Sequence, residues 1–455
     1  MDDCYERTGV KMIRGNWIDR RVSARDTSTS VEVLTVLATD EDTGVRLLVA
    51  GNPNAPVDVL AVLATDEDWG VRLVVAGNEN APAEVLAVLA TDKDWRVRWA
   101  VAENKNSPAG ALKRLANDED LGIRRLVAGN KNSPAGALKK LAMDENKDIR
   151  EAVAGNLNTS VEVLDRLAGD DAWYIRRAVA ENPSVPPKVL SELANDEDSS
   201  VRRAVAGNPD TPAEALVTLA VDEEWLVRQA VAKNPDTPAD TLVELAMDKY
   251  GYIRQSVAEN QSTPGEMLAK LAMDWNVDVR KAVAGNIVTQ NKVLAKLAKN
   301  KDGDVRRVVA GNTGTSVETL ALLATDEDSS VRREVAGNTN TQNKVLAKLA
   351  KDKDSDIRCE VAGNPNTPAE VLAKLATNDN EYIRQLVAKN PSSPAKAIKI
   401  LASDKKYHIR RTVASRFDIS TEIISVLSRD RSKVVRLALS SNPNLPTEKP
   451  KTYQR

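Results

Sequence analysis

Residues 71–96 decide the fold, and they read VRLVVAGNENAPAEVLAVLATDKDWR. The Val/Ile-Arg pair that opens this stretch recurs every 26 residues, from Val45 to Val435, without a visible insertion. Sixteen such pairs are separated by fifteen equal steps. A fixed period of about 20–50 residues is typical of solenoids, in which repeats stack on their neighbours along one continuous core. The sequence therefore predicts an elongated repeat protein and not a set of separate globular domains.

The composition of the 455 residues agrees with such a core and excludes several classes of protein. Hydrophobic residues make up 42% but aromatic residues only 3%, so the predicted core is aliphatic. The net charge of −2 gives no overall attraction to nucleic acid or to an anionic membrane. Cys4 and Cys359 lie far apart in a solenoid, so we expect no disulfide framework, no metal site and no cofactor. No apolar run approaches the ~18 residues of a membrane span, which favours a cytoplasmic protein.

Each repeat is expected to contain two helices, and its positions are numbered here from the Val/Ile as position 1. Positions 11 and 12 are mostly Thr/Ser-Pro, as in Thr211-Pro212. A hydroxyl residue followed by Pro predicts a helix N-cap and first helical residue. Apolar residues at positions 16, 19 and 20, such as Leu60, Leu63 and Ala64, then form one stripe. This pattern predicts a first helix of about eight or nine residues.

The second helix is expected to begin at the acidic residues of positions 22 and 24. Asp at these positions caps the helix and places negative charge at the positive end of its dipole. The helix carries the Val/Ile-Arg pair and ends at Asn in position 8, which is often followed by Pro. No strand pattern is visible. The predicted fold is an all-α solenoid of about sixteen two-helix repeats.

The two ends of the chain depart from the repeat. Residues 1–27 are expected to form an irregular N-terminal cap, in which WIDRRVSARD (17–26) is a degenerate unit with a one-residue slip. Terminal repeats are atypical because one of their sides faces water. The solenoid is expected over 28–440, and 441–455 reads as a cap and frayed tail, since Pro446 and Pro450 prevent another full helix.

One face of the second helix differs from repeat to repeat. On a helical wheel, positions 1, 4, 5 and 8 form the buried arc, and positions 3, 7, 25 and 26 lie opposite. Every Trp and Tyr of the regular repeats lies at position 3 or at positions 23 to 26. Trp and Tyr commonly anchor interfaces, which favours a binding surface. The alternative is that these rings cover gaps between neighbouring helices. Leu47, Trp69, Leu73, Trp95 and Trp99 are predicted to form one connected apolar patch.

Further along the chain, position 3 becomes basic. A row of Arg and Lys side chains can hold an acidic peptide or a phosphate backbone, or it can be a solvated helix face. The predicted binding residues of the whole face are Leu47, Trp69, Leu73, Trp95, Trp99, Arg125, Trp173, Tyr174, Arg177, Arg203, Trp225, Tyr252, Arg307, Arg333 and Tyr382.

Two other regularities are predicted to be structural. Position 2 is Arg in all sixteen units, and position 22 is Asp in fourteen and Asn in two, Asn300 and Asn378. This predicts a stacked Asp–Arg ladder that ties loop to helix and repeat to repeat. Asn at position 8, replaced only by Arg416, predicts a second ladder that caps turn backbone.

Catalysis and metal binding are disfavoured by the same spacings. The Asp-Glu-Asp triplets suit helix capping better than a calcium loop, whose ligands extend across about twelve residues. His408 is the only histidine, and Cys359 has no histidine near it to activate its thiol.

The repeat resembles a known family. The pattern Val-Arg-x-x-Val-Ala-x-Asn-Pro-x-Thr-Pro-x-x-x-Leu-x-x-Leu-Ala-x-Asp is similar to the leucine-rich repeat variant family, and residues 201–222 carry every element. Asp196 and Arg202, with the preceding Val, also resemble the HEAT-repeat signature. The resemblance covers roughly residues 28–445 and implies a right-handed superhelix of paired short helices that binds and does not catalyse. Some members carry an N-terminal cysteine-rich iron–sulfur segment, which is not expected here because only Cys4 is present.

The predicted function is that of a non-catalytic scaffold that recognises a protein or peptide through the groove of second helices. The alternative is a nucleic-acid-binding solenoid that uses the position-3 Arg row and the aromatic rings. The acidic loops and the net charge of −2 disfavour that alternative. A monomer is the default expectation.

Overall fold

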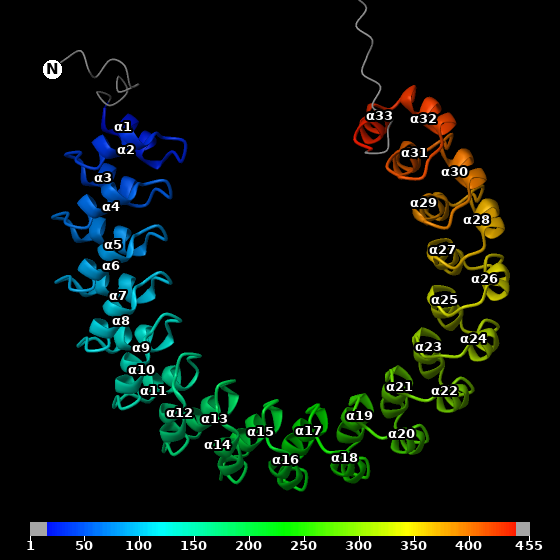
Figure 1. Ribbon diagram of the computed structural model, residues 1–455, viewed down its shortest axis with the longest axis horizontal. Coiled ribbons are helices and arrows are strands. Elements are labelled where there is room, and N and C mark those ends of the chain that lie inside the picture. Colours follow the sequence, from blue (N-terminus) through cyan, green and yellow to red (C-terminus); the bar gives the residue numbers. More distant parts are fainter. Residues whose placement is uncertain (1–15, 443–455) are drawn as a thin grey trace, which may run out of the picture. The chain divides into compact units, whose positions relative to one another are not determined.

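The computed structural model describes residues 16–442, and this part of the chain contains 33 helices and no strand. The prediction of an all-α repeat fold is confirmed (Figure 1). The second helices of the repeats are α1 (Trp17–Arg25), α3 (Thr43–Ala50), α5 (Trp69–Gly77), α7 (Trp95–Glu103), α9 (Leu121–Gly129), α11 (Lys147–Ala154), α13 (Trp173–Glu181), α15 (Ser199–Gly207), α17 (Trp225–Lys233), α19 (Gly251–Glu259), α21 (Val277–Gly285), α23 (Gly303–Gly311), α25 (Ser329–Gly337), α27 (Ser355–Gly363), α29 (Glu381–Lys389), α31 (Tyr407–Ala414) and α33 (Lys433–Ser440).

The first helices alternate with them along the chain. They are α2 (Val31–Leu37), α4 (Val57–Leu63), α6 (Ala83–Leu89), α8 (Ala109–Leu115), α10 (Ala135–Leu141), α12 (Val161–Leu167), α14 (Pro187–Leu193), α16 (Ala213–Leu219), α18 (Ala239–Leu245), α20 (Gly265–Leu271), α22 (Asn291–Leu297), α24 (Val317–Leu323), α26 (Asn343–Leu349), α28 (Ala369–Leu375), α30 (Ala395–Leu401) and α32 (Thr421–Ser428).

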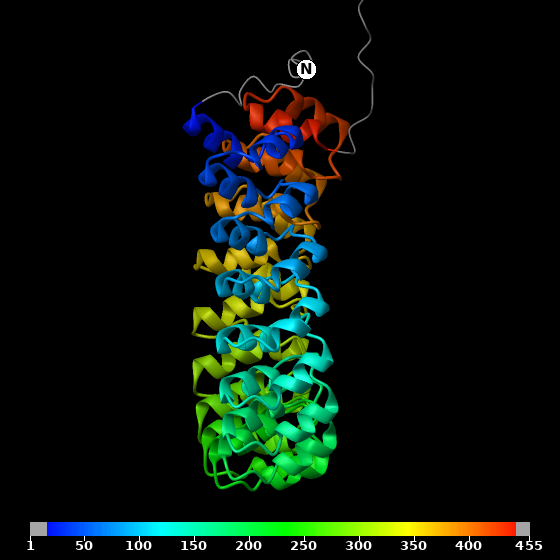
Figure 2. The same cartoon turned by 90° about the vertical axis from the view of Figure 1, so that its left-hand side faces the viewer.

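The chain divides into two compact units between Asp236 and Thr237. Within each unit, second helices of successive repeats pack directly against one another, whereas first helices mainly contact the second helices that flank them. The layers are therefore closer together at the second helices, which lie on the inner side of the curve of each unit (Figure 1). Figure 2 shows the helix pairs of the first unit as successive layers.

The core is aliphatic, as predicted. Val71, Val75 and Ala76 of α5 have no exposed surface, and Leu60 and Leu63 of α4 are at most 1% exposed. The same repeat positions are buried in layer after layer. Each layer thus covers the apolar stripe of the one before it, which explains why the period tolerates no insertion.

The first helices begin one residue later than predicted and are shorter. Pro212 is the N-cap of α16, and the Thr211 hydroxyl points backwards and donates to the carbonyl of Val205 at 2.5 Å. The Val205 carbonyl also accepts the N–H of Asn208, and equivalent hydroxyl bonds form in repeats without Pro after the Asn, such as Ser107 to Val101. The predicted Thr N-cap is therefore wrong. The regular first helices have seven residues, not eight or nine.

The one-residue slip expected at the N-terminal end is also wrong. Helix α1 begins at Trp17, in the register of Trp69 in α5, which lies two periods further on. Arg20 pairs with Asp40 at 2.7 Å, as arginines at position 2 do in later repeats. The Thr29 hydroxyl donates to the Ser23 carbonyl, as position 11 does elsewhere. Helix α1 is therefore the second helix of a repeat in full register, and the limits of the predicted cap remain a prediction.

Candidate binding face and the ladders that support it

The Asp–Arg ladder is present, and most of its arginines bind the carboxylate that lies 20 residues ahead, in the loop before the next second helix. Arg72 donates from Nε and Nη2 to the two carboxylate oxygens of Asp92, at 2.6 and 3.0 Å. Its Nη1 donates to the backbone carbonyl of Asp66, six residues earlier, at 2.7 Å. The Asp66 carboxylate in turn accepts from Arg46 and from the N–H of Asp68. Each aspartate thus joins the arginines of two successive repeats to a loop.

Nearly the same pair recurs along both units, with Nε–Oδ2 distances of 2.6 to 2.8 Å. Burial raises the pKa of the Asp92 carboxyl, but the hydrogen bonds from Arg72 and from the N–H of Asp94 outweigh it. The pKa of Asp92 therefore lies below its ordinary value, and its carboxyl stays ionised in the ladder. Their role is structural, as the sequence indicated.

The ladder lacks its carboxylate at the two repeats that carry Asn. Asn300 uses Oδ1 to accept the N–H of Asp302. Its Nδ2 amide group therefore stands where other layers have the second carboxylate oxygen, the one that accepts from the arginine. Arg280 still donates to the carbonyl of Asp274, but its Nε is buried without a hydrogen-bond partner. Arg358, which faces Asn378, likewise bonds backbone carbonyls but no ladder carboxylate.

The Asn ladder is also confirmed. Asn78 donates from Nδ2 to the carbonyls of Ala50 and Asn52 in the preceding repeat, at 2.7 and 3.3 Å. Its Oδ1 accepts the N–H of Asn80, which closes the turn after the second helix. Buried carbonyls at helix ends need such donors.

Arg416, the one exception at position 8, performs the same task with a guanidinium group. Its Nη1 donates to the carbonyls of Ala388 and Asn390, at 2.8 and 2.7 Å. The carboxylate of Asp418 binds the other edge of the guanidinium and balances its charge. The ladder thus continues through this layer with a different donor.

The fifteen predicted binding residues all keep solvent-accessible side chains. Trp95 is 50% exposed, Trp69 38% and Trp173 40%, and the remaining members are exposed or half-buried. All of them lie on the second helices, either at the first turn or at position 3. The structure places them on this face, but it divides them between two units and brings together only some of them.

The predicted apolar patch is interrupted at Trp69. The Arg96 guanidinium carbon lies 3.4 Å from the centroid of the Trp69 ring. The same guanidinium binds Asp94, the N-cap of α7, and thereby lowers the pKa of Asp94 to about 2. Trp69 is thus engaged in a cation–π contact, which leaves less of its ring free for a ligand.

Trp95 and Trp99 do come together, edge to face, with ring centroids 6.3 Å apart. The Trp99 ring leans over the next helix, where a Cβ on Gly122 would lie only 2.3 Å from it. Trp99 therefore covers the seam between α7 and α9 and still presents one side to solvent. Trp99 thus covers a gap between neighbouring helices, whereas its use in binding remains a prediction.

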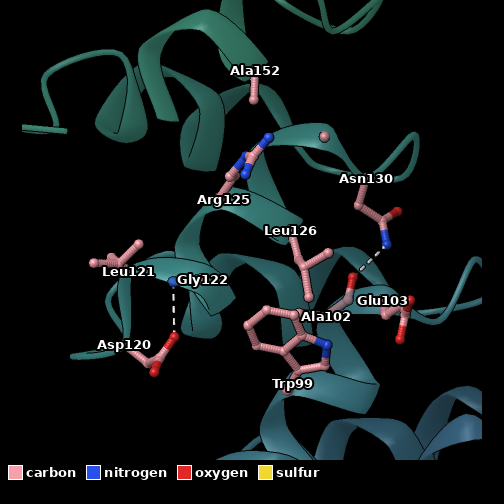
Figure 3. A pocket seen from close by; sticks show the side chains of 11 residues that line it. Trp99, Ala102, Glu103, Asp120, Leu121, Gly122, Arg125, Leu126, Asn130 and Ala152 are labelled. Carbon is pink, nitrogen blue, oxygen red and sulfur yellow. Dashed lines mark hydrogen bonds between the residues drawn. The ribbon is translucent and has the colours of Figure 1, made fainter. Parts of the chain in front are cut away.

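A hollow of about 800 Å³ opens beside Trp99 on the second-helix face (Figure 3). Leu121, Leu126 and Ala102 supply apolar walls, and Arg125 and Glu103 supply charge. Arg125 forms no ion pair with any described residue, whereas the nearby Asp120 carboxylate is occupied by the N–H groups of Gly122 and Ile123.

Of these lining residues, the sequence predicted only Trp99 and Arg125. Leu121, Leu126, Glu103 and Gly122 were missed. A usable signal existed, since a Trp at position 3 is followed by a Gly at position 26 of the same repeat, where the next second helix begins, and only a missing side chain leaves room for the ring.

A second cluster lies on α13. The Trp173 and Tyr174 rings pack edge to face at 5.8 Å, and Arg177 lies 5.3 Å from the Trp173 ring. Arg177 also pairs with Glu181 on the same helix, at 3.5 Å.

The basic row is partly neutralised by its own helices. Besides Arg177, Lys281 pairs with Asp278 at 2.7 Å and Arg307 contacts Asp304 at 3.4 Å. Arg203 and Arg333 are exposed and form no ion pair with a described residue. A continuous track of free positive charge, which a phosphate backbone needs, is not present on this face of the described residues.

Reactive groups are scarce within residues 16–442. Burial raises the pKa of the Cys359 thiol, and the carboxylates of Asp356 and Glu360 raise it further, so the thiolate is disfavoured. His, Cys, Asp and Glu side chains nowhere gather there in threes as metal ligands do. Over the same range every helix is too short or too polar to cross a lipid bilayer.

Comparison with known proteins agrees with this repeat architecture. The sequence profile of the leucine rich repeat variant matches at four places, residues 43–68, 95–120, 200–224 and 225–249. Four repeats of the chain thus match the leucine rich repeat variant, the family that the sequence pattern resembles. Each matched segment runs over one repeat of the register described above, and the intervening repeats carry the same ladders. No match is found among curated proteins.

Solved structures are similar to this chain over different lengths. One, described as a leucine-rich repeat variant with a novel repetitive structural motif, is 26% identical, covers 49% of this chain and 88% of its own, and gives a TM-score of 0.38. An engineered protein is 20% identical over 93% of both chains, with a TM-score of 0.20. A Kap121p mutant is 12% identical over 94% of this chain and 54% of its own, with a TM-score of 0.35.

Proposed function

We propose that this protein is a non-catalytic scaffold that binds a protein or peptide segment on the second helices α5–α9. The observation that carries the proposal is the hollow beside Trp99, where an aromatic ring, two leucines and an arginine without an ion pair share one concave surface. Binding pockets commonly combine apolar walls with a few polar groups that fix orientation.

The chemistry of the hollow favours a segment with one apolar side chain next to a carboxylate. Leu121 is 56% exposed, and its side chain and the Trp99 ring offer surface that gains from being covered. Complete burial of one apolar side chain contributes about 1.5–3 kcal/mol. The Arg125 guanidinium can donate two parallel hydrogen bonds to a carboxylate. A single hollow gives modest affinity, so we expect further contacts along the same face.

Selection from a displayed library of random peptides, followed by calorimetry on the enriched sequences, tests this proposal. Trp99→Ala is expected to weaken binding at least about tenfold, equivalent to ~1.4 kcal/mol. Trp225→Ala is the matched control, because Trp225 lies on α17, five repeats further along the chain and outside α5–α9, and it is expected to change the affinity less than about twofold. Circular dichroism of both variants checks that the helices are retained.

Enriched peptides that bind both variants as tightly as the unchanged protein would contradict the proposed site. So would a library from which no peptide is enriched. The cytoplasmic location and the monomeric state expected from the sequence remain predictions, and size-exclusion chromatography with light scattering tests the second of them.

A further inference from the structure

A second exposed surface lies away from the second-helix face, on the loops that join first to second helices in the second unit. Three successive loops form it, residues 247–250, 273–276 and 299–302. Trp275 is 79% exposed, Met247 77% and Met273 62%. Large apolar side chains that are this exposed on neighbouring loops are of the kind that marks interaction sites.

Trp275 is held in place by the ladder beneath it. The Arg254 guanidinium carbon lies 5.3 Å from the centroid of the Trp275 ring. Arg254 is itself fixed by Asp274, with Nε and Oδ2 2.6 Å apart. The ring therefore rests on an ordered ion pair while most of its surface faces solvent, which lowers the entropic cost of using it as an anchor.

These loops contain three lysines and three half-buried aspartates, Asp248, Asp274 and Asp302, so that their fully exposed charges are the positive ones. Lys249, Lys299 and Lys301 are exposed, and Asn300 stands where other loops carry the ladder aspartate. The carboxylate of Asp274 is occupied by Arg254, and that of Asp302 caps α23.

Most of the equivalent loops of the first unit have the opposite charge, with Lys93 as the exception. At the repeat position of Lys249 and Lys301 they carry acidic residues whose side chains are 87 to 91% exposed, namely Glu41, Glu67, Glu119 and Glu197. The fold therefore does not determine the sign of the charge on these loops, because positive and negative side chains both occur at the same repeat position.

We propose that the loops 247–250, 273–276 and 299–302 bind an acidic peptide segment that carries an apolar side chain. The Met and Trp side chains would cover the apolar group, and Lys299 and Lys301 would pair with its flanking carboxylates. Methionine adapts its shape to different partners, which suits a peptide. A nucleic acid fits less well, because it calls for successive stacking rings along a basic track. Glu327, 91% exposed in the next loop, ends the basic run.

Fluorescence anisotropy with labelled synthetic peptides tests the proposal on the full chain. The probe is a short polyglutamate peptide with one central leucine, and its counterpart has lysines in place of the glutamates. Lys299→Glu combined with Lys301→Glu is expected to weaken probe binding at least about tenfold, and Trp275→Ser at least about threefold. Added salt should weaken binding, since the charges involved are exposed.

The matched control is Lys351→Glu combined with Lys353→Glu. These lysines occupy the same two repeat positions two layers further on, beside Asp352 instead of Asn and without an exposed Trp in the adjoining loops. This variant is expected to change the affinity less than about twofold.

Three results would overturn the proposal: no binding of the acidic probe, equal losses in the two double variants, or tighter binding of the lysine counterpart. Preferential binding of a single-stranded oligonucleotide that depends on Trp275 would replace the peptide with a nucleic acid. All substituted side chains are exposed, and circular dichroism checks that each variant is folded.

Discussion

Restoring the missing carboxylate at Asn300 is expected to stabilise the second unit. In the intact layers an aspartate at this position receives two hydrogen bonds from the arginine of the preceding repeat. Asn300 presents an amide group to Arg280 instead, and the buried Nε of Arg280 has no partner. Asn300→Asp changes one atom group and supplies the acceptor without altering side-chain volume.

The size of the effect follows from the burial of the equivalent pairs. The side chains of Arg306 and Asp326, in the next layer, are 11% and 8% exposed. Hydrogen bonds to charged groups contribute about 1.5–3 kcal/mol, whereas exposed ion pairs contribute ~0–1 kcal/mol. The new carboxylate must also lose part of its hydration, which offsets some of the gain. We therefore expect Asn300→Asp to raise the free energy of unfolding by about 1–2 kcal/mol.

Hydrogen exchange followed by mass spectrometry suits this measurement, because a long repeat array need not unfold in one step. Slower exchange is expected in the segments that cover α21 and α23. Thr313→Asp is the matched control, since it adds the same charge to an exposed turn of the same repeat, far from a ladder arginine. We expect its effect to stay within about 0.5 kcal/mol.

Unchanged or faster exchange in the Asn300→Asp protein would refute the reasoning. It would mean that desolvation of the carboxylate outweighs its hydrogen bonds to Arg280. The gain should also vanish in acid, as the new carboxyl becomes protonated below about pH 4.

Three further perturbations test other parts of the account. The ladder carboxyls of Asp92 and Asp326 have pKa values below their ordinary range, so the stability that these two contribute is present above pH ~4 and is lost as the pH falls through the lowered values, which acid titration by circular dichroism measures. Arg416→Asn should change the unfolding free energy by less than about 1 kcal/mol, whereas Arg416→Ala should lower it by about 1–3 kcal/mol in urea titrations, because it leaves two carbonyls without donors. Gly122→Ala should displace the Trp99 ring and shift tryptophan fluorescence, whereas Gly129→Ala, with open space around its Cβ, should not.

The sequence predicted the helix pairs, the buried core and the two ladders of this protein because these features repeat. A buried Val or Leu that returns every 26 residues has one explanation, the stacking of identical layers, and the Asp–Arg and Asn ladders follow from the same constancy. The direction of the arginine pairs was harder to foresee. Because each Asp is followed six residues later by the Arg, the sequence suggested a local contact between these two side chains. The structure shows that the arginine side chain binds the carboxylate 20 residues ahead, and that it bonds only the backbone carbonyl of the Asp six residues behind.

The binding face was predicted less completely, for a different physical reason. Exposure follows from helix periodicity, so Trp69, Trp95 and Trp99 were placed on the correct side of the helix. Whether neighbouring side chains form one common surface depends on the orientation of each side chain. Arg96 covers Trp69, and the missing side chain of Gly122 gives Trp99 its place. Neither contact can be deduced from position alone.

Hydroxyl-radical footprinting of the protein with a library-selected peptide bound tests the central claim, that the varied face of the second helices is where ligands bind. We expect the bound peptide to reduce the oxidation of Trp95, Trp99 and Leu121. The oxidation of Met143, which lies on a loop outside this face, is expected to stay the same. Reduced oxidation of Met143 or of the first helices, with Trp99 as reactive as in the free protein, would contradict it.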